Sequence, residues 1–301
     1  MKTMTSFHLK VLRGILKFSK VSPIAPLFFL LGELPIEATL HLDILTLFWS
    51  IWANPQTKIH DIVKYLLMMS GASSLTWSAH VRILFQLYHL PDPLTLLSET
   101  PWTKERWKMT IRTAVTTYTE AIWRRKAADN SKLGFLNVQT LGLSRKVHPV
   151  LLGIITTQDV MRSRIHVRML AGDYPCFANI GSHLHGDNYC KLCQALRPQT
   201  PAPVEGMVHL VTMCRATAET RTRILPDLLN LVSQYYPYNQ ILLEPNPTQL
   251  TQFILDPTSL NLPVGIRICS NSKDLHKVIT VCRNICFSIH KDRTKQLRIF
   301  N

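Results

Sequence analysis

Apolar residues recur at helical spacing through most of the first 170 residues. A stretch dense in Leu, Ile, Phe and Trp is stopped by Asn54 and Pro55, which predicts a buried helix that ends there. A longer stretch follows Thr103, a candidate N-cap, and its apolar positions line one face, as in a helix packed on a core. The pattern predicts helices at residues 37–52, 59–67, 78–90, 103–129 and 157–170.

Proline and glycine break the second half of the chain more often. Residues 181–203 are rich in loop-forming residues, and a helical pattern at residues 216–236 is followed by the breakers Pro237, Pro245 and Pro247. Because Pro226 lies inside that pattern, a kink or two shorter helices are expected there. A final helix is predicted at residues 273–298. The predicted fold class is mainly α: a multi-helix region, a small loop-rich segment and a C-terminal helix.

The N-terminal residues combine positive charge with an apolar stretch, as a signal peptide does. Pro23 and Pro26 interrupt the apolar residues 21–31, and no small-residue cleavage site comes after them. The stretch is also shorter than the roughly 20 residues that span a bilayer. We therefore expect a basic N-terminal helix followed by a buried one, no transmembrane segment and no secretion. The expected location is intracellular, in the cytoplasm or nucleus.

The charge balance is strongly positive. Thirty-four Lys and Arg against nineteen Asp and Glu give a formal net charge of +15 and a pI of about 9.7. An excess of this size favours a polyanionic partner, either a nucleic acid or an anionic membrane surface. A basic protein without such a partner would have the same composition.

Four metal-ligating residues have the spacing of a zinc site: Cys190-x2-Cys193-x15-His209-x4-Cys214. A Cys-x2-Cys pair directs two thiolates at one ion from a tight turn, and a His and a Cys five positions apart can supply the other two ligands. Three Cys and one His complete a zinc tetrahedron and leave no position for water, which is typical of structural sites. The sequence therefore predicts one structural Zn²⁺ in the loop-rich segment.

Other metal-ligating residues are weaker candidates. His183 and His185 could compete as ligands, but their surroundings are typical of an exposed loop. Cys282 and Cys286 lie one helical turn apart with His290 a further turn on, and Val281, Ile285 and Ile289 run beside them. Packed core thiols are the favoured interpretation of this second group, and a metal site is the alternative.

Clusters of cations suggest phosphate contacts. Lys10, Arg13 and Lys17 share one predicted helix face, and others end the long helix or flank the zinc residues. Each cluster alone is typical of a solvated face, whereas several around one zinc site suggest a surface that binds RNA, DNA or both. The candidate nucleic-acid contacts are Lys10, Arg13, Lys17, Arg124, Arg125, Lys126, Arg162, Arg164, Arg168, Arg221 and Arg223.

No catalytic pattern is present in the sequence. It has no Gly-rich phosphate loop, no nucleophile elbow and no paired Asp of a polymerase metal site. The acidic residues are scattered, so we expect neither an enzyme nor a small-molecule substrate.

Several short stretches resemble the C-terminal region of the reverse transcriptase open reading frame of non-LTR (LINE-type) retrotransposons. The resemblance runs from about residue 27 to the end, and the zinc segment is its most specific part. It implies ligand roles for the four zinc residues. The stretches that carry it are 30–38 (LLGELPIEA), 88–93 (YHLPDP), 104–108 (KERWK), 170–174 (LAGDY), the Cys-x2-Cys, Glu205-to-His209 and Cys214 elements, and 253–257 (FILDP) with Ile289-His290.

The resemblance implies a connection and a zinc-binding end without the polymerase fingers and palm or the endonuclease. In that family, the zinc-binding end is thought to hold template RNA or target DNA. The first hypothesis is therefore a non-catalytic, zinc-stabilised nucleic-acid-binding module; the alternatives are a helical scaffold for protein interactions and a non-functional retrotransposon relic. The predicted divisions are a basic N-terminal helix (1–26), a connection or thumb-like helical region (27–175), a zinc-binding segment with the following helix (176–236) and a C-terminal extension (237–301).

Overall fold

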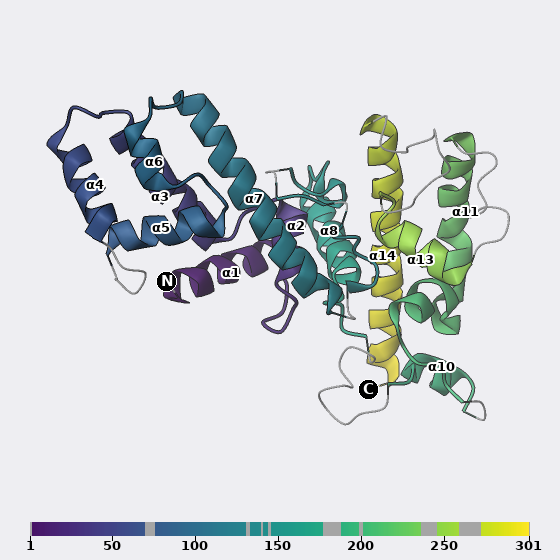
Figure 1. Cartoon of the computed structure of the whole chain (residues 1–301). Coiled ribbons are helices and arrows are strands. Elements are labelled where there is room, and N and C mark those ends of the chain that lie inside the picture. The colour runs from purple at the N-terminus through teal and green to yellow at the C-terminus, as the bar shows by residue number, and fades with distance from the viewer. Residues whose placement is uncertain are drawn as a thin grey trace. The chain divides into compact units, whose positions relative to one another are not determined.

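The computed structural model is mainly helical, as the sequence predicts (Figure 1). In the part of the chain that the structure describes, no β-strand occurs, and the one extended pairing is an isolated antiparallel bridge between Tyr189 and Val204. Among the described residues, no helix combines the length and the apolar character needed to cross a bilayer. The structure describes residues 2–69, 76–130, 133–139, 141–143, 146–176, 188–198, 201–235, 246–258 and 272–300.

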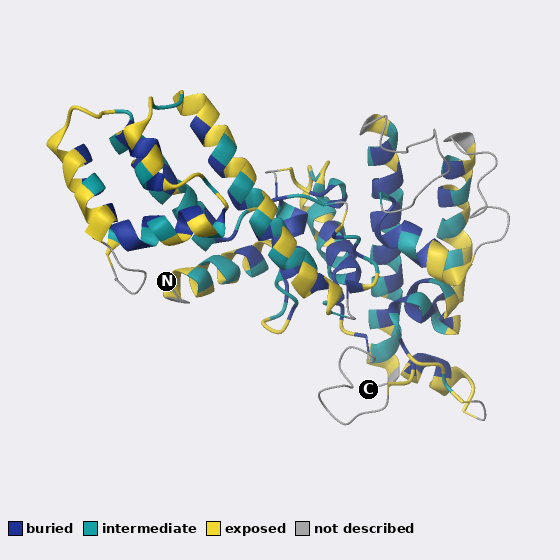
Figure 2. Cartoon of the chain, in the orientation of Figure 1, coloured by how far each residue is buried: buried dark blue, intermediate teal, exposed yellow. Residues whose placement is uncertain are grey.

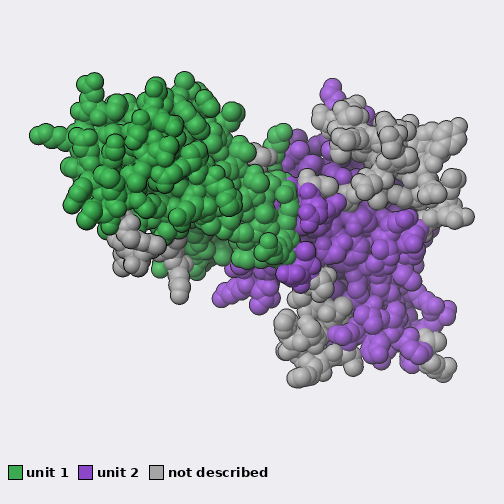
Figure 3. Space-filling view, in the orientation of Figure 1, with its two compact units in different colours: residues 1–10, 32–126, 142–146 green, residues 11–31, 127–141, 147–301 purple. Residues whose placement is uncertain are grey.

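The chain forms two compact units, each built from several stretches (Figure 3). Unit 1 contains residues 1–10, 32–126 and 142–146, and unit 2 contains residues 11–31, 127–141 and 147–301. The four divisions predicted from the sequence stay a prediction, and each unit is described by itself below.

Unit 1 is a set of helices whose starts depend on local sequence. Thr103 accepts a hydrogen bond from the Arg106 N–H at 3.3 Å and Asp92 caps the helix before it, which confirms the N-cap at Thr103. Gly32 has a φ of +64°, and a Cβ there would lie 2.4 Å from the Lys146 carbonyl oxygen, so only glycine fits beside that stretch of backbone. The helices are α3 (Ile36–Trp52), α4 (Lys58–Met69), α5 (Trp77–Leu87), α6 (Pro93–Ser98) and α7 (Lys104–Ala128), of which α7 continues past the unit's end; α1 (Lys2–Leu16) begins in unit 1.

Aromatic side chains form the centre of unit 1, where Figure 2 shows the inward faces of its helices buried. The Phe48 and Phe85 rings meet edge to face at 4.8 Å, and the Trp52 and Trp107 rings at 5.7 Å. The two buried indole N–H groups donate to the carbonyls of Glu99 (from Trp52) and of Leu45 (from Trp107). Trp52 and Trp107 are therefore buried with their indole N–H groups hydrogen-bonded.

Unit 2 is organised around the long C-terminal helix α14 (Ser272–Phe300). It packs against α8 (Thr157–Leu170) on one side and α11 (Ala218–Tyr235) on the other (Figure 1). Thr156 and Asp159 form a capping box that fixes the start of α8, and α11 runs as one helix through Pro226. The remaining elements of unit 2 are α2 (Ala25–Leu31), η2 (Pro149–Leu151), α10 (Lys191–Leu196), η3 (His209–Met213), η4 (Arg215–Thr217) and α13 (Pro247–Leu255).

Buried polar groups join elements of unit 2 that are distant in sequence. The Asp173 carboxylate accepts hydrogen bonds from the Ser19 hydroxyl at 2.6 Å and from Arg168 at 3.0 Å, and also from the Ser22 hydroxyl. His166 in α8 is fully buried, and its Nε2 lies 2.8 Å from the Leu255 carbonyl oxygen at the end of α13. These bonds hold the elements in one arrangement because each group would be left unsatisfied if its partner moved.

Candidate metal centre

Two short segments bring the four predicted zinc ligands together. Cys190 immediately precedes α10 and Cys193 lies in the first turn of that helix. His209 begins the π-helical turn η3, and Cys214 comes directly after it. The Cys214 N–H donates to the His209 carbonyl at 2.6 Å, an i+5 bond that brings both side chains to the same side of the turn.

Backbone pairing aligns the two arms of this metal-ligand segment (residues 188–198 and 201–217). The Cys190 N–H donates to the Pro203 carbonyl at 2.8 Å, and the Glu205 N–H donates to the Asn188 carbonyl at 2.9 Å. These bonds flank the Tyr189–Val204 bridge and set Cys190 beside the chain that leads to His209. This short antiparallel contact therefore brings the Cys190–Cys193 pair close to the His209–Cys214 pair.

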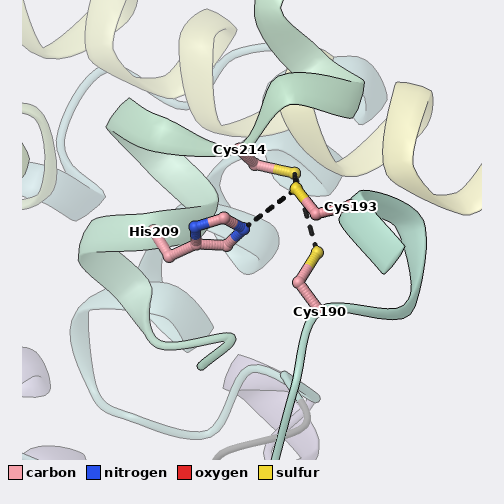
Figure 4. Close-up of side chains that lie close together, drawn as sticks. All are labelled: Cys190, Cys193, His209 and Cys214. Atoms are coloured by element: carbon pink, nitrogen blue, oxygen red, sulfur yellow. Dashed lines mark hydrogen bonds between the residues drawn. The ribbon is translucent and has the colours of Figure 1, made fainter. Parts of the chain in front are cut away.

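The four side chains converge on one point, as Figure 4 shows. Their ligand atoms all lie within 4.8 Å of one another, and all four residues are buried. The Sγ of Cys214 is 3.8 Å from that of Cys190 and 3.7 Å from that of Cys193, and the Cys193 Sγ is 3.5 Å from the His209 Nε2. The group could hold a metal ion such as zinc.

The separations between these atoms match the edges of a zinc tetrahedron. With Zn–S bonds of about 2.3 Å and a Zn–N bond of about 2.0 Å, the S···S edges are about 3.8 Å and the S···N edges about 3.5 Å. Three edges of the observed group have these lengths. Thiol and imidazole ligands are also the donor set that zinc prefers over Mg²⁺ or Ca²⁺.

The sulfur atoms perturb one another's protonation. The hydrogen bond with Cys214, together with burial, raises the pKa of the Cys190 thiol well above its ordinary range. The same hydrogen bond, aided by His209, lowers the pKa of Cys214 to about 3. These shifts favour the thiolate at Cys214, the form in which cysteine binds a metal.

Arg221 supplies a positive charge beside these sulfur atoms. It lies on α11 seven residues after Cys214, and its Nη1 donates to the Thr217 hydroxyl at 2.7 Å. Burial lowers the pKa of Arg221, and the neighbouring Cys214 and Cys193 sulfurs oppose that change. With a divalent cation bound, three thiolates would leave a net charge of −1, which this guanidinium would offset.

Helix α14 braces the metal-ligand segment. Arg293 forms a 2.6 Å ion pair with Glu205, and both side chains are buried. The Gln296 amide donates to the Ala216 carbonyl at 2.6 Å, and Leu297 packs against the cysteine cluster. Glu205 and Arg293 are 88 residues apart, so no local pattern could have revealed this pair.

The ion pair extends into an aromatic contact. The Arg293 guanidinium lies 5.7 Å from the centre of the Tyr174 ring, and the Tyr174 hydroxyl is 2.8 Å from the His290 Nδ1. Burial raises the pKa of Tyr174 to about 12, and burial also lowers the pKa of His290. His290 is therefore occupied by a hydrogen bond to tyrosine.

The second cysteine group lies in the core of unit 2. Cys282 and Cys286 are fully buried, and the Cys282 thiol points at the Phe253 carbonyl, 3.9 Å away. Burial raises the pKa of both thiols. Among the described residues, the quartet of Cys190, Cys193, His209 and Cys214 is the only group of three or more such side chains that could hold one metal. His183 and His185 lie outside the described residues.

The predicted nucleic-acid contacts are spread over several helices. Arg124 pairs with Glu120 at 2.9 Å, and Arg168 pairs with Asp173, so both already have carboxylate partners. Arg13 is half-buried and donates to the Ser22 carbonyl at 3.3 Å. Half-buried Arg162 and Arg164 lie on α8. The exposed members of the set are Lys10, Lys17, Arg125, Lys126 and Arg223.

Comparison with protein-family models, with curated proteins and with solved structures found no match to this chain in any of the three.

Proposed function

We propose that this chain is a zinc-stabilised nucleic-acid-binding module without enzymatic activity. The observation that carries the proposal is the buried Cys190–Cys193–His209–Cys214 group with the edge lengths of a zinc tetrahedron. Four protein ligands fill the coordination shell, so the zinc has no open position for water or substrate. Its role is to hold the metal-ligand segment in its fold.

The nucleic-acid half of the proposal rests on charge and on the family resemblance. A net charge of +15 attracts a polyanion, and several cations are exposed. The resemblance to the C-terminal region of LINE-type reverse transcriptases supports a role in holding template RNA or target DNA. The proposed partner is RNA, DNA or both.

Metal analysis tests the zinc site. The full-length protein, purified under reducing conditions, should carry about one zinc per chain by elemental mass spectrometry. Cys190→Ser should lose that zinc, whereas the matched control Cys286→Ser, which changes a buried thiol outside the group, should keep it. A zinc content near zero in the unaltered protein would overturn the site.

Salt titration tests the nucleic-acid partner. Binding of a labelled single-stranded RNA should weaken steeply as salt rises from about 50 to 200 mM, because phosphate contacts release counterions. No binding of RNA or DNA at low salt would overturn this half of the proposal and leave the zinc site unaffected.

A helical scaffold for protein interactions is the second candidate function. One face of α4 exposes an unusual number of large apolar side chains for a surface helix, which favours a protein partner. If this function holds, Tyr65→Ser with Met69→Ser should abolish self-association or partner binding and leave zinc content unchanged. The exposed residues are Ile59, Ile62, Tyr65, Leu66 and Met69, at 60%, 56%, 58%, 42% and 67%.

A further inference from the structure

The first half of α7 carries a row of exposed cations, Lys104, Lys108 and Arg112, hereafter the α7 row. Steps of four residues put neighbouring members on adjacent positions of the helix surface, about 6 Å apart along the axis. All three side chains are exposed, and Figure 2 shows exposed positions along this end of α7. The spacing resembles that of successive phosphates along one nucleic-acid strand.

The α7 row opposes two rules of helix stability. Like charges four residues apart repel each other, which applies to both steps of the row. Lys104 is also the first residue of α7, where the positive end of the helix dipole disfavours a cation. Neither the spacing within the row nor the place of Lys104 therefore stabilises α7.

Ion pairing does not account for the row either. Among the described residues, no carboxylate lies within 4.0 Å of the charged atoms of Lys104, Lys108 or Arg112. The exposed Glu105 is close in sequence but makes no such pair. Lys104 lies 5.7 Å over the Trp49 ring, a contact that leaves its charge unneutralised.

The other end of α7 shows the ordinary arrangement. Arg124 pairs with Glu120 one turn earlier, and Arg125 and Lys126 lie in the last turn, where the dipole favours cations. Helix stability explains these three residues without a ligand. It does not explain the α7 row.

We infer that the α7 row binds the phosphodiester backbone of a single nucleic-acid strand, one phosphate per cation. This inference rests on the proposed nucleic-acid-binding function and names residues for it that lie outside the metal centre, in unit 1. Bound phosphates would neutralise the repulsion between neighbouring cations. The contact would be independent of base sequence, because it reads the backbone alone.

The test compares two triple variants of the full-length protein. Lys104→Gln, Lys108→Gln and Arg112→Gln remove the α7 row. The control Lys291→Gln, Lys295→Gln and Arg298→Gln removes the same residue types, also exposed and similarly spaced, from the C-terminal half of α14. The probe is a labelled single-stranded RNA of about 20 nucleotides, titrated at several salt concentrations.

Loss of the α7 row should lower the slope of log K against log salt by about 2 and weaken binding at least tenfold at low salt. The control should keep a slope close to that of the unaltered protein. Equal losses in both variants would mean diffuse attraction to net charge, and no loss in either would mean that the strand binds elsewhere; both outcomes overturn the inference. An unaltered protein that binds no RNA or DNA overturns the proposed function as well.

Two further readouts separate the alternatives. The melting temperature should stay the same or rise when the α7 row is removed, and a fall of several degrees would mean that the cations are structural. Anionic phosphatidylserine vesicles provide the second readout. If the unaltered protein binds these vesicles through the row but does not bind RNA, the partner is a membrane surface and the inference is wrong.

Discussion

The aromatic core of unit 1 and the metal-ligand segment of unit 2 hold the chain together by different means. In unit 1, Phe48, Trp52, Phe85 and Trp107 bury large rings, each of which contributes a substantial hydrophobic free energy. The apolar cluster around the metal ligands is much smaller, with three cysteines and Leu192 as its buried members. So small a cluster contains little apolar area, and the four ligands can add a cross-link through a metal.

Metal removal should affect the two regions very differently. A chelator should unfold the metal-ligand segment, because structural zinc contributes on the order of 10 kcal/mol to folding at neutral pH. Hydrogen exchange should accelerate at amides such as Cys214 N–H, which bonds to His209 in the π turn. All six tryptophans lie in unit 1, so tryptophan fluorescence should not change. A chelator-induced shift in that fluorescence would contradict the comparison.

The reverse experiment disrupts the aromatic core. Trp107→Ala should reduce the free energy of unfolding of unit 1 by about 3–5 kcal/mol, because it removes a fully buried indole and its bond to Leu45. Urea denaturation measures the loss, with the half-buried Trp123→Ala as a milder control. Zinc content should be the same in both variants. Zinc loss in Trp107→Ala would show that the two regions depend on each other.

Outside the metal-ligand segment, unit 2 contains a buried histidine, His166. Burial lowers the pKa of His166 to about 3, against an ordinary value of 6.5. Between these two values the unfolded state binds more protons than the folded state, so stability should fall as the pH is lowered through this window. The loss is about 1.4 kcal/mol per pH unit below about pH 6.5, or about 2 kcal/mol by pH 5.

The His166→Gln variant isolates this effect, since its amide can still donate to the Leu255 carbonyl but does not titrate. Urea denaturation at several pH values should show the stability of the unaltered protein approaching that of the variant as the pH falls to about 5. Any zinc loss in acid is common to both proteins and cancels in the difference. Parallel pH profiles would mean that His166 is protonated in the folded protein.

The predictability of these regions from sequence depends on the range of the signals involved. The helix at residues 157–170 could be predicted with its correct ends because apolar periodicity and a glycine stop are local signals. The metal quartet could be predicted because its four ligands fall within 25 residues at a recognisable spacing. The long-range polar contacts could not be predicted, since Glu205–Arg293 and Ser19–Asp173 join residues 88 and 154 positions apart.

Two arginines that were both predicted as phosphate contacts acquire different neighbours in the fold. Arg221 and Arg223 are two residues apart on α11 and look alike in sequence. Because a helix turns about 100° per residue, they point in different directions: Arg221 reaches Thr217 beside the cysteine sulfurs, whereas Arg223 is exposed. Only the packing of the metal-ligand segment separates their roles.

The different surroundings of Arg221 and Arg223 lead to the prediction with the smallest and most specific effect. Arg221→Gln should weaken zinc binding about tenfold, because the net negative charge of three thiolates and one zinc would lose a neighbouring cation that balances it. Arg221→Lys should restore part of the affinity, and Arg223→Gln should leave it unchanged. Competition with a chromogenic chelator measures all three constants. Equal affinities for Arg221→Gln and Arg223→Gln would show that Arg221 does not balance the charge, and the cross-link would then depend on its four ligands alone.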